Sequence, residues 1–226
     1  GRRTRNLLLA AAAALLALLL PVFLGTSTYS IMLCCVIEIY IIAVSGLDIV
    51  FGYCGQISLG HAAFYAIGCY ASAILHNTFG ISPLITSIIA ALLAAGLGAL
   101  LAYPASKLVF HFLSLATVAF GEIVYQFLIH SPGYITGDFQ GKYSDPMSLF
   151  GISLADYRLW YYFGLVMVVL FLLAKWYLVH SRTGRAFTAI RENGHAANGM
   201  GINVRKYKVM AFATSAFYTA FAGAMY

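Results

Sequence analysis

The sequence predicts an all-α, polytopic membrane protein with about seven spans, one glycine-broken segment and one cytoplasmic loop. Three observations support this fold class. Hydrophobic residues make up 62% of the 226 residues and charged residues only 9%, against about 25% charged residues in soluble proteins. Apolar runs of membrane-spanning length recur along the chain, and a single glycine-rich stretch interrupts them. We expect one transmembrane domain over residues 1–226, with a cytoplasmic loop at residues 180–208 inside it.

The apolar segments are long enough, or nearly so, to cross about 30 Å of hydrocarbon at 1.5 Å per helical residue. The expected spans are 7–24, 31–51, 61–75, 84–103, 108–129, 157–179 and 209–226. A cleaved signal peptide is the competing interpretation of the first span, although no A-x-A-like site follows it. Gly1 is not an initiator Met and Tyr226 lies inside an apolar run, so we expect a piece of a longer chain, truncated at its C-terminus.

The glycine-rich stretch at residues 46–70 is the most informative part of the sequence. Glycines cost a helix about 1 kcal/mol each relative to alanine, so the backbone is expected to unwind over residues 52–59. Unwound backbone inside a bilayer has to face protein or water, which makes this stretch a candidate pathway lining. The candidate residues are Gly52, Gly55, Gln56, Ser58, Gly60 and His61. An ordinary short loop between two helices is the alternative.

Three acidic residues lie within expected spans, where each costs on the order of 3 kcal/mol at lipid depth. Glu38 and Asp48 share a helix face with Ser45, so neither is expected to face lipid, although Asp48 could simply lie in the interfacial zone. Glu122 in the span 108–129 is either a pathway residue or a hydrogen-bonding anchor between helices. The four cysteines have no metal-type spacing and are expected to pack as small core residues.

Small residues and helix caps give further detail. The spans 84–103 and 209–226 carry small residues at every fourth position, a pattern that allows close helix packing in lipid. In the loop 180–208 we expect Thr183 to cap a short helix that runs through Asn193, with Gly194 stopping it. A second short helix ends at Gly201, and Asn203 caps the final span.

The basic residues indicate orientation. With a cytoplasmic N-terminus, only Lys142 and Arg158 of the 13 Lys and Arg residues fall outside the cell. This distribution follows the positive-inside rule. The formal net charge of +6 is therefore explained by membrane topology, and no nucleic-acid partner is expected.

Three sequence blocks carry a resemblance to a known family. The blocks are Gly52-Tyr-Cys-Gly-Gln-Ile-Ser-Leu-Gly-His-Ala-Ala-Phe, Ala116-Thr-Val-Ala-Phe-Gly-Glu-Ile, and Ser181-Arg-Thr-Gly-Arg-Ala-Phe-Thr-Ala-Ile-Arg-Glu-Asn followed by Gly201-Ile-Asn-Val. They resemble the LivM-type permeases of the LivH/LivM family, which belong to bacterial ABC importers for branched-chain amino acids. Thr136-Gly137-Asp138 departs from the Thr-Gly-Gly that is frequent in that family.

The resemblance implies a permease subunit in the bacterial plasma membrane that works by alternating access. Its implied partners are a second LivH/LivM-type permease, two cytoplasmic ABC ATPases, an extracytoplasmic substrate-binding protein and membrane lipid. ATP would be used by the partner ATPases, and no cofactor is expected on this chain. The residues implied to couple the permease to the ATPases are Arg185, Arg191, Glu192, Asn193 and Gly201.

The sequence also narrows the function class directly. It contains no G-x-x-x-x-G-K-[ST] loop and no paired catalytic constellation, so an enzyme is not expected. An ion-coupled transporter or channel using Glu38, Asp48 and Glu122 remains an alternative. A membrane enzyme with Glu122 and either His61 or His111 is a weaker one. Within the ABC permease class, urea or short amides are alternative substrates.

Overall fold

The computed structural model describes residues 17–21, 28–105, 110–136, 148–149, 152–153 and 156–226, and these are almost entirely helical. The principal helices are α2 (Thr28–Asp48), α3 (His61–Phe79), α4 (Pro83–Ala105), α5 (Phe110–His130), α7 (Tyr157–His180) and α10 (Val204–Met225). The short helices are the π-helix η1 (Ile49–Tyr53), α6 (Gly133–Thr136), α8 (Arg182–Glu192) and α9 (Gly194–Gly199). Two-residue strands, β1 (Ser148–Leu149) and β2 (Ile152–Ser153), pair antiparallel in a loop. The predicted all-α class is confirmed.

Four helices in the described part of the chain are long and apolar enough to cross a membrane. They are Thr28–Tyr53, Pro83–Pro104, Leu113–His130 and Tyr157–His180. α3 and α10 occupy two further expected spans as helices of 19 and 22 residues, but they are less apolar. The expected first span lies mostly outside the described residues, of which 17–21 are helical.

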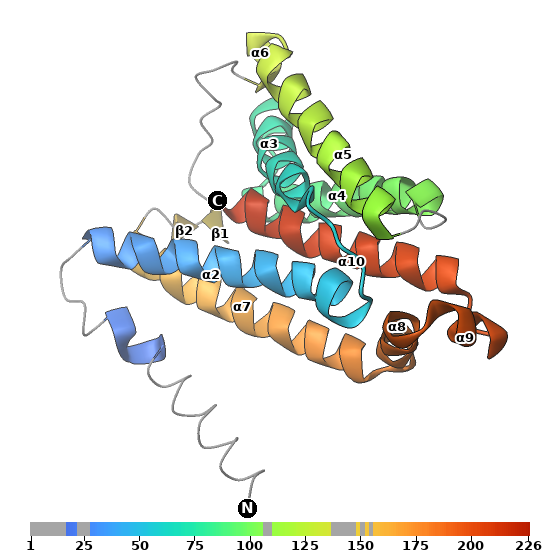
Figure 1. Cartoon of the computed structure of the whole chain (residues 1–226). Helices are drawn as coiled ribbons and strands as arrows, with labels where there is room; N and C mark the ends of the chain where they lie inside the picture. Colours follow the sequence, from blue (N-terminus) through green and yellow to red (C-terminus); the bar gives the residue numbers. More distant parts are fainter. Residues whose placement is uncertain (1–16, 22–27, 106–109, 137–147, 150–151, 154–155) are drawn as a thin grey trace, which may run out of the picture.

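α10 forms the centre of the bundle and packs against α2, α3 and α4 (Figure 1). Close approach is possible because small residues face one another, as the sequence pattern predicts. A Cβ on Gly68 of α3 would collide with the Ala220 carbonyl of α10, and a Cβ on Gly98 of α4 would lie 2.8 Å from the Ala216 Cβ. Ala216 and Ala220 are both fully buried.

α2 and α7 lie side by side and run in the same direction (Figure 1). At the start of α7 the Tyr157 carbonyl accepts a hydrogen bond of 3.6 Å from the thiol of Cys35, the eighth residue of α2. Near their last turns Lys175 Nζ lies 2.6 Å from a carboxylate oxygen of Asp48. The expectation that Glu38 avoids lipid is confirmed, because only 6% of its surface is exposed and it lies on the face of α2 that packs on α7.

α8 and α9 lie at the end of the bundle where α7 ends and α10 begins (Figure 1). The expected cap at Thr183 is wrong by two residues, since the Ser181 hydroxyl accepts the N–H groups of Thr183 and Gly184. Gly194 does not separate the two short helices, because it is the first residue of α9 and Asn193 caps that helix. The predicted cap at Asn203 is confirmed by its bond from the Lys206 N–H.

Candidate coupling and pathway site at the helix break

The helix break, defined here as residues 54–60, joins α2 to α3 through non-helical backbone. The expected break at 52–59 is therefore shifted, because α2 first continues as the π-helix η1. Gly52 belongs to this π-helix, where a Cβ would collide with the Asp48 carboxylate one turn earlier. Gly55 follows with a φ of +69°, the left-handed region that glycine adopts without strain. π-Helical turns of this kind are frequent at functional sites.

Two cations from other helices contact the π-helix. The Arg191 guanidinium of α8 donates to the Gly52 carbonyl, which the π-helix leaves available. The stem of Arg191 lies directly over Gly55, where a Cβ would come within 2.9 Å of the Arg191 Cγ. Lys175 of α7 pairs with Asp48 and lies 6.0 Å from the Tyr53 ring centroid. The end of α2 is thus connected to both α7 and α8.

The far end of the break is held by a buried chain of polar side chains. His61 Nδ1 lies 2.7 Å from the Ser58 hydroxyl, and His61 Nε2 lies 2.6 Å from the Ser215 hydroxyl of α10. All three side chains are buried. Because both ring nitrogens are engaged, His61 links the break to α10 and offers no free nitrogen to a ligand.

α5 closes over the same end of the break. The Leu59 N–H donates to the Thr117 hydroxyl at 3.1 Å. A Cβ on Gly60 would collide with the Thr117 carbonyl, so only glycine allows this approach. Gln56, also buried, donates to the Cys54 sulfur at 3.5 Å. The break is therefore partly covered by protein, with Gln56 and Ser58 buried and Leu59 exposed.

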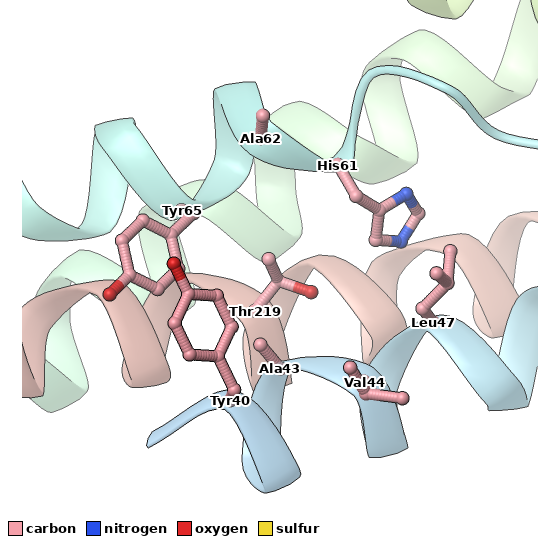
Figure 2. Close-up of a pocket in the computed structure, with 8 residues that line it drawn as sticks. All are labelled: Tyr40, Ala43, Val44, Leu47, His61, Ala62, Tyr65 and Thr219. Carbon is pink, nitrogen blue, oxygen red and sulfur yellow. The ribbon is translucent and has the colours of Figure 1, made fainter. Parts of the chain in front are cut away.

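A pocket of about 240 Å³ lies beside His61 between α2, α3 and α10 (Figure 2). Its wall is mostly apolar, and its tyrosines, Tyr40 and Tyr65, stack with ring centroids 6.3 Å apart and planes inclined by 7°. The full lining is Tyr40, Ala43, Val44, Leu47, His61, Ala62, Tyr65 and Thr219. Both nitrogens of His61 are already engaged, and the buried Tyr65 hydroxyl in the wall has no hydrogen-bond partner among the described residues.

Comparison with known proteins identifies the family. Residues 29–226 match the family described as branched-chain amino acid transport system, permease component. The chain belongs to this permease family. It is 34% identical, over 212 residues, to the high-affinity branched-chain amino acid transport system permease protein LivM of Escherichia coli strain K12. That alignment covers 83% of this chain and 50% of the relative.

Two further relatives carry similar names. The Salmonella typhimurium LivM permease is 32% identical over 212 residues, with the same coverage of both chains. The probable LivM permease of Methanocaldococcus jannaschii is 24% identical over 222 residues, covering 83% of this chain and 63% of the relative. The chain thus spans about half the length of the two bacterial relatives. The comparison with solved structures gives no significant match.

The predicted coupling residues of this permease chain lie on α8 and in the turns that follow it. Arg185, Arg191 and Glu192 are all exposed, but the Arg191 guanidinium reaches the π-helix. Asn193 is used as the α9 cap and accepts the His195 and Ala196 N–H groups. Gly201, at the turn before α10, has a φ of +84°. Its neighbour Met200, not singled out from the sequence, is 84% exposed at the same turn.

Glu122 lies apart from the other predicted pathway residues of the permease. It is exposed on α5 and accepts a hydrogen bond of 2.7 Å from Gln126 one turn later. The structure thus gives no support to the interpretation of Glu122 as an anchor between helices of the described chain. The side chain of His111 lies outside the described residues.

Sequence reasoning missed the partners that complete this site. Thr117 bonds to the break, Lys175 lies over the Tyr53 ring of the π-helix, and Ser215 bonds to His61 at the start of α3. Ser215 was visible only as one of the small residues of the last span, and its spacing suggested packing alone. The signal available in the sequence was a hydroxyl within a stripe of small residues. Such a stripe is expected to be buried, and a buried polar group requires a partner.

Proposed function

We propose that this chain belongs to the membrane permease of an ABC importer in the bacterial inner membrane that takes up branched-chain or related amino acids. The permease family and the names of the relatives support this class of function and substrate. In this proposal the N-terminus is cytoplasmic, the chain has no ATPase site, and separate ATPases supply the energy. A second permease and an extracytoplasmic binding protein complete the importer.

The observation that carries the proposal is the contact of α8 with the helix break. α8 is amphipathic, with Ala186, Phe187 and Ile190 buried against the bundle. Its opposite side carries exposed charged residues that are available to a soluble partner. Through Arg191, a displacement of α8 would act directly on the π-helix that precedes the break.

The polar chain through His61 extends this connection into the bundle. Movement of the break would act on Ser58 and His61, and through Ser215 on α10. α10 packs against α2, α3 and α4, so a change in its position would alter the whole bundle. We propose that ATP-driven movement of the cytoplasmic partners switches the accessible side of the pathway by this route. The residues proposed to line or control the pathway remain Gly52, Gly55, Gln56, Ser58, Gly60, His61 and Glu122.

Affinity purification tests the assembly. The full-length tagged protein would be isolated in mild detergent, and the co-purifying proteins identified by mass spectrometry. We expect a second permease and P-loop ATPases. Recovery of the chain alone, with uptake that depends on an ion gradient, would contradict the proposal and favour an ion-coupled carrier.

A further inference from the structure

The α2–α7 contact contains a carboxyl group that the importer proposal does not use. Glu38 is the eleventh of the 26 residues in the span Thr28–Tyr53, so it lies near mid-membrane depth. Both carboxyl oxygens are shielded, and neither has a hydrogen-bond partner among the described residues. Glu38 is thus enclosed by the protein itself.

The opposite helix is shaped to receive this carboxyl group. Gly164 of α7 faces Glu38, and a Cβ at that position would collide with the Glu38 Oε2. Gly164 is itself buried. The missing side chain therefore creates the space that the carboxyl group occupies between the two helices.

Two of the polar groups beside Glu38 donate their hydrogens elsewhere. Among the described residues, the titratable groups that interact electrostatically with Glu38 are Cys34, Cys35 and Tyr161. The Cys35 thiol donates to the Tyr157 carbonyl, and the Tyr161 hydroxyl donates to the Ala17 carbonyl at 2.7 Å. Lys175, further along α7, is paired with Asp48. Since neither carboxyl oxygen has a hydrogen-bond partner among the described residues, an ionised Glu38 would lack both a cation and a donor there.

We propose that Glu38 is a proton-binding site and that its neutral carboxylic acid is the form that fits between α2 and α7. A buried carboxylate without a cation or donor is strongly disfavoured, and taking up a proton is the usual way in which a protein avoids it. The neutral form needs no counter-charge in the space beside Gly164. Release of the proton would place an uncompensated charge between the helices and loosen their contact. This inference is independent of the proposed importer function.

Infrared spectroscopy of the full-length protein in lipid nanodiscs tests the protonation state directly. Glu38, Glu122 and Glu192 are the glutamates of residues 1–226, and any others in the full-length protein contribute equally to every variant. With glutamate labelled by carbon-13 at the side-chain carboxyl, we expect at neutral pH a carbonyl band of a protonated acid that shifts with the label. The band should be unchanged in Glu122→Gln and Glu192→Gln and should lose intensity in Glu38→Gln. Absence of a label-sensitive band from the otherwise unmodified protein would overturn the proposal, even if Glu38→Gln failed to fold.

Thermal unfolding of the same samples provides a second readout. Glu38→Gln is a neutral isostere, so its melting temperature should match that of the unmodified protein below about pH 4, where the glutamate is protonated in the unfolded chain as well. As the pH is raised from there to neutral, the unmodified protein should lose stability relative to Glu38→Gln, because its unfolded chain releases the Glu38 proton while the folded state keeps it. A large loss of stability in Glu38→Gln at neutral pH would show that an ionised carboxylate has a partner, and would also overturn the proposal.

Discussion

Arg191 joins the cytoplasmic helices to the membrane bundle through two different parts of its side chain. Its guanidinium donates to the Gly52 carbonyl, and its stem covers Gly55. Hydrogen bonds to charged groups contribute about 1.5–3 kcal/mol. The free energy lost with this side chain is therefore large enough to change how α8 and the π-helix move together. Most of the bundle should stay packed.

Replacement of Arg191 by alanine should lower the amount of substrate taken up per ATP hydrolysed. The expected reason is that α8 can then move without displacing the π-helix. The measurement is paired uptake and ATP hydrolysis in proteoliposomes that contain the complete importer. Arg182→Ala is the matched control, since Arg182 is an exposed arginine of the same helix. Equal uptake per ATP in the two variants would contradict the role given to Arg191.

Gly201 provides a second residue-scale prediction. Its φ of +84° disfavours any L-residue, although no heavy atom lies within 4 Å of a Cβ placed there. Gly201→Ala should therefore cost about 1–2 kcal/mol through backbone strain alone. Gly199→Ala is the control, because Gly199 has the same open space and no positive φ. We expect Gly201→Ala to assemble with its partners but to take up less substrate per ATP hydrolysed. An unchanged ratio of uptake to hydrolysis would contradict this prediction and show that the turn adapts.

At the scale of elements, the glycines on α3 and α4 divide into those that allow helix contact and those that do not. Gly68 and Gly98 face α10 directly, whereas no atom lies within 4 Å of a Cβ on Gly96. Glycine is thus required for helix packing at Gly68 and Gly98, but not at Gly96.

Gly68→Ala should destabilise the protein, because the added methyl group would meet the Ala220 backbone of α10. Overpacking of this kind costs about 1–3 kcal/mol. Gly96→Ala should be neutral or slightly stabilising, since alanine favours helix over glycine. Thermal unfolding in detergent compares the two. Equal melting temperatures would mean that α3 and α10 do not approach as closely as described.

The elements were largely predictable from sequence, whereas the contacts that form the site were not. Helical segments and small-residue faces depend on local spacing, and Ala91, Ala94 and Ala102 are buried as that spacing predicts. The bond from Arg191 to Gly52 connects residues 139 positions apart, and the bond from His61 to Ser215 connects residues 154 positions apart. Such pairs depend on the three-dimensional arrangement of the helices. The π-helix was also missed, and the guanidinium that bonds to its Gly52 carbonyl comes from a distant part of the chain.

At the scale of the whole molecule, the helix break, α8, α9 and the start of α10 lie at one end of the bundle (Figure 1). Tyr29 lies at the beginning of α2, towards the other end, and is 70% exposed. In the proposed orientation, the end that contains Met200 is cytoplasmic.

Cysteine labelling tests this orientation. In a background without the four native cysteines, Met200→Cys should react with a membrane-impermeant maleimide only in inside-out vesicles. Tyr29→Cys should react only in right-side-out vesicles, and each position serves as the control for the other. The opposite pattern would reverse the proposed topology, and labelling of both positions from one side would contradict the parallel arrangement of α2 and α7.

The buried position of α10 has a consequence for biosynthesis. This helix carries buried hydroxyls at Ser215 and Thr219, and basic residues at its start make it less apolar than the four strongest spans. Lipid alone is therefore a poor solvent for it, whereas α2, α3 and α4 supply partners for its polar groups and small residues. These three helices are synthesised first. We expect the translocon to release α10 into a site that they have already formed, so that its insertion depends on the earlier helices more than on its own hydrophobicity.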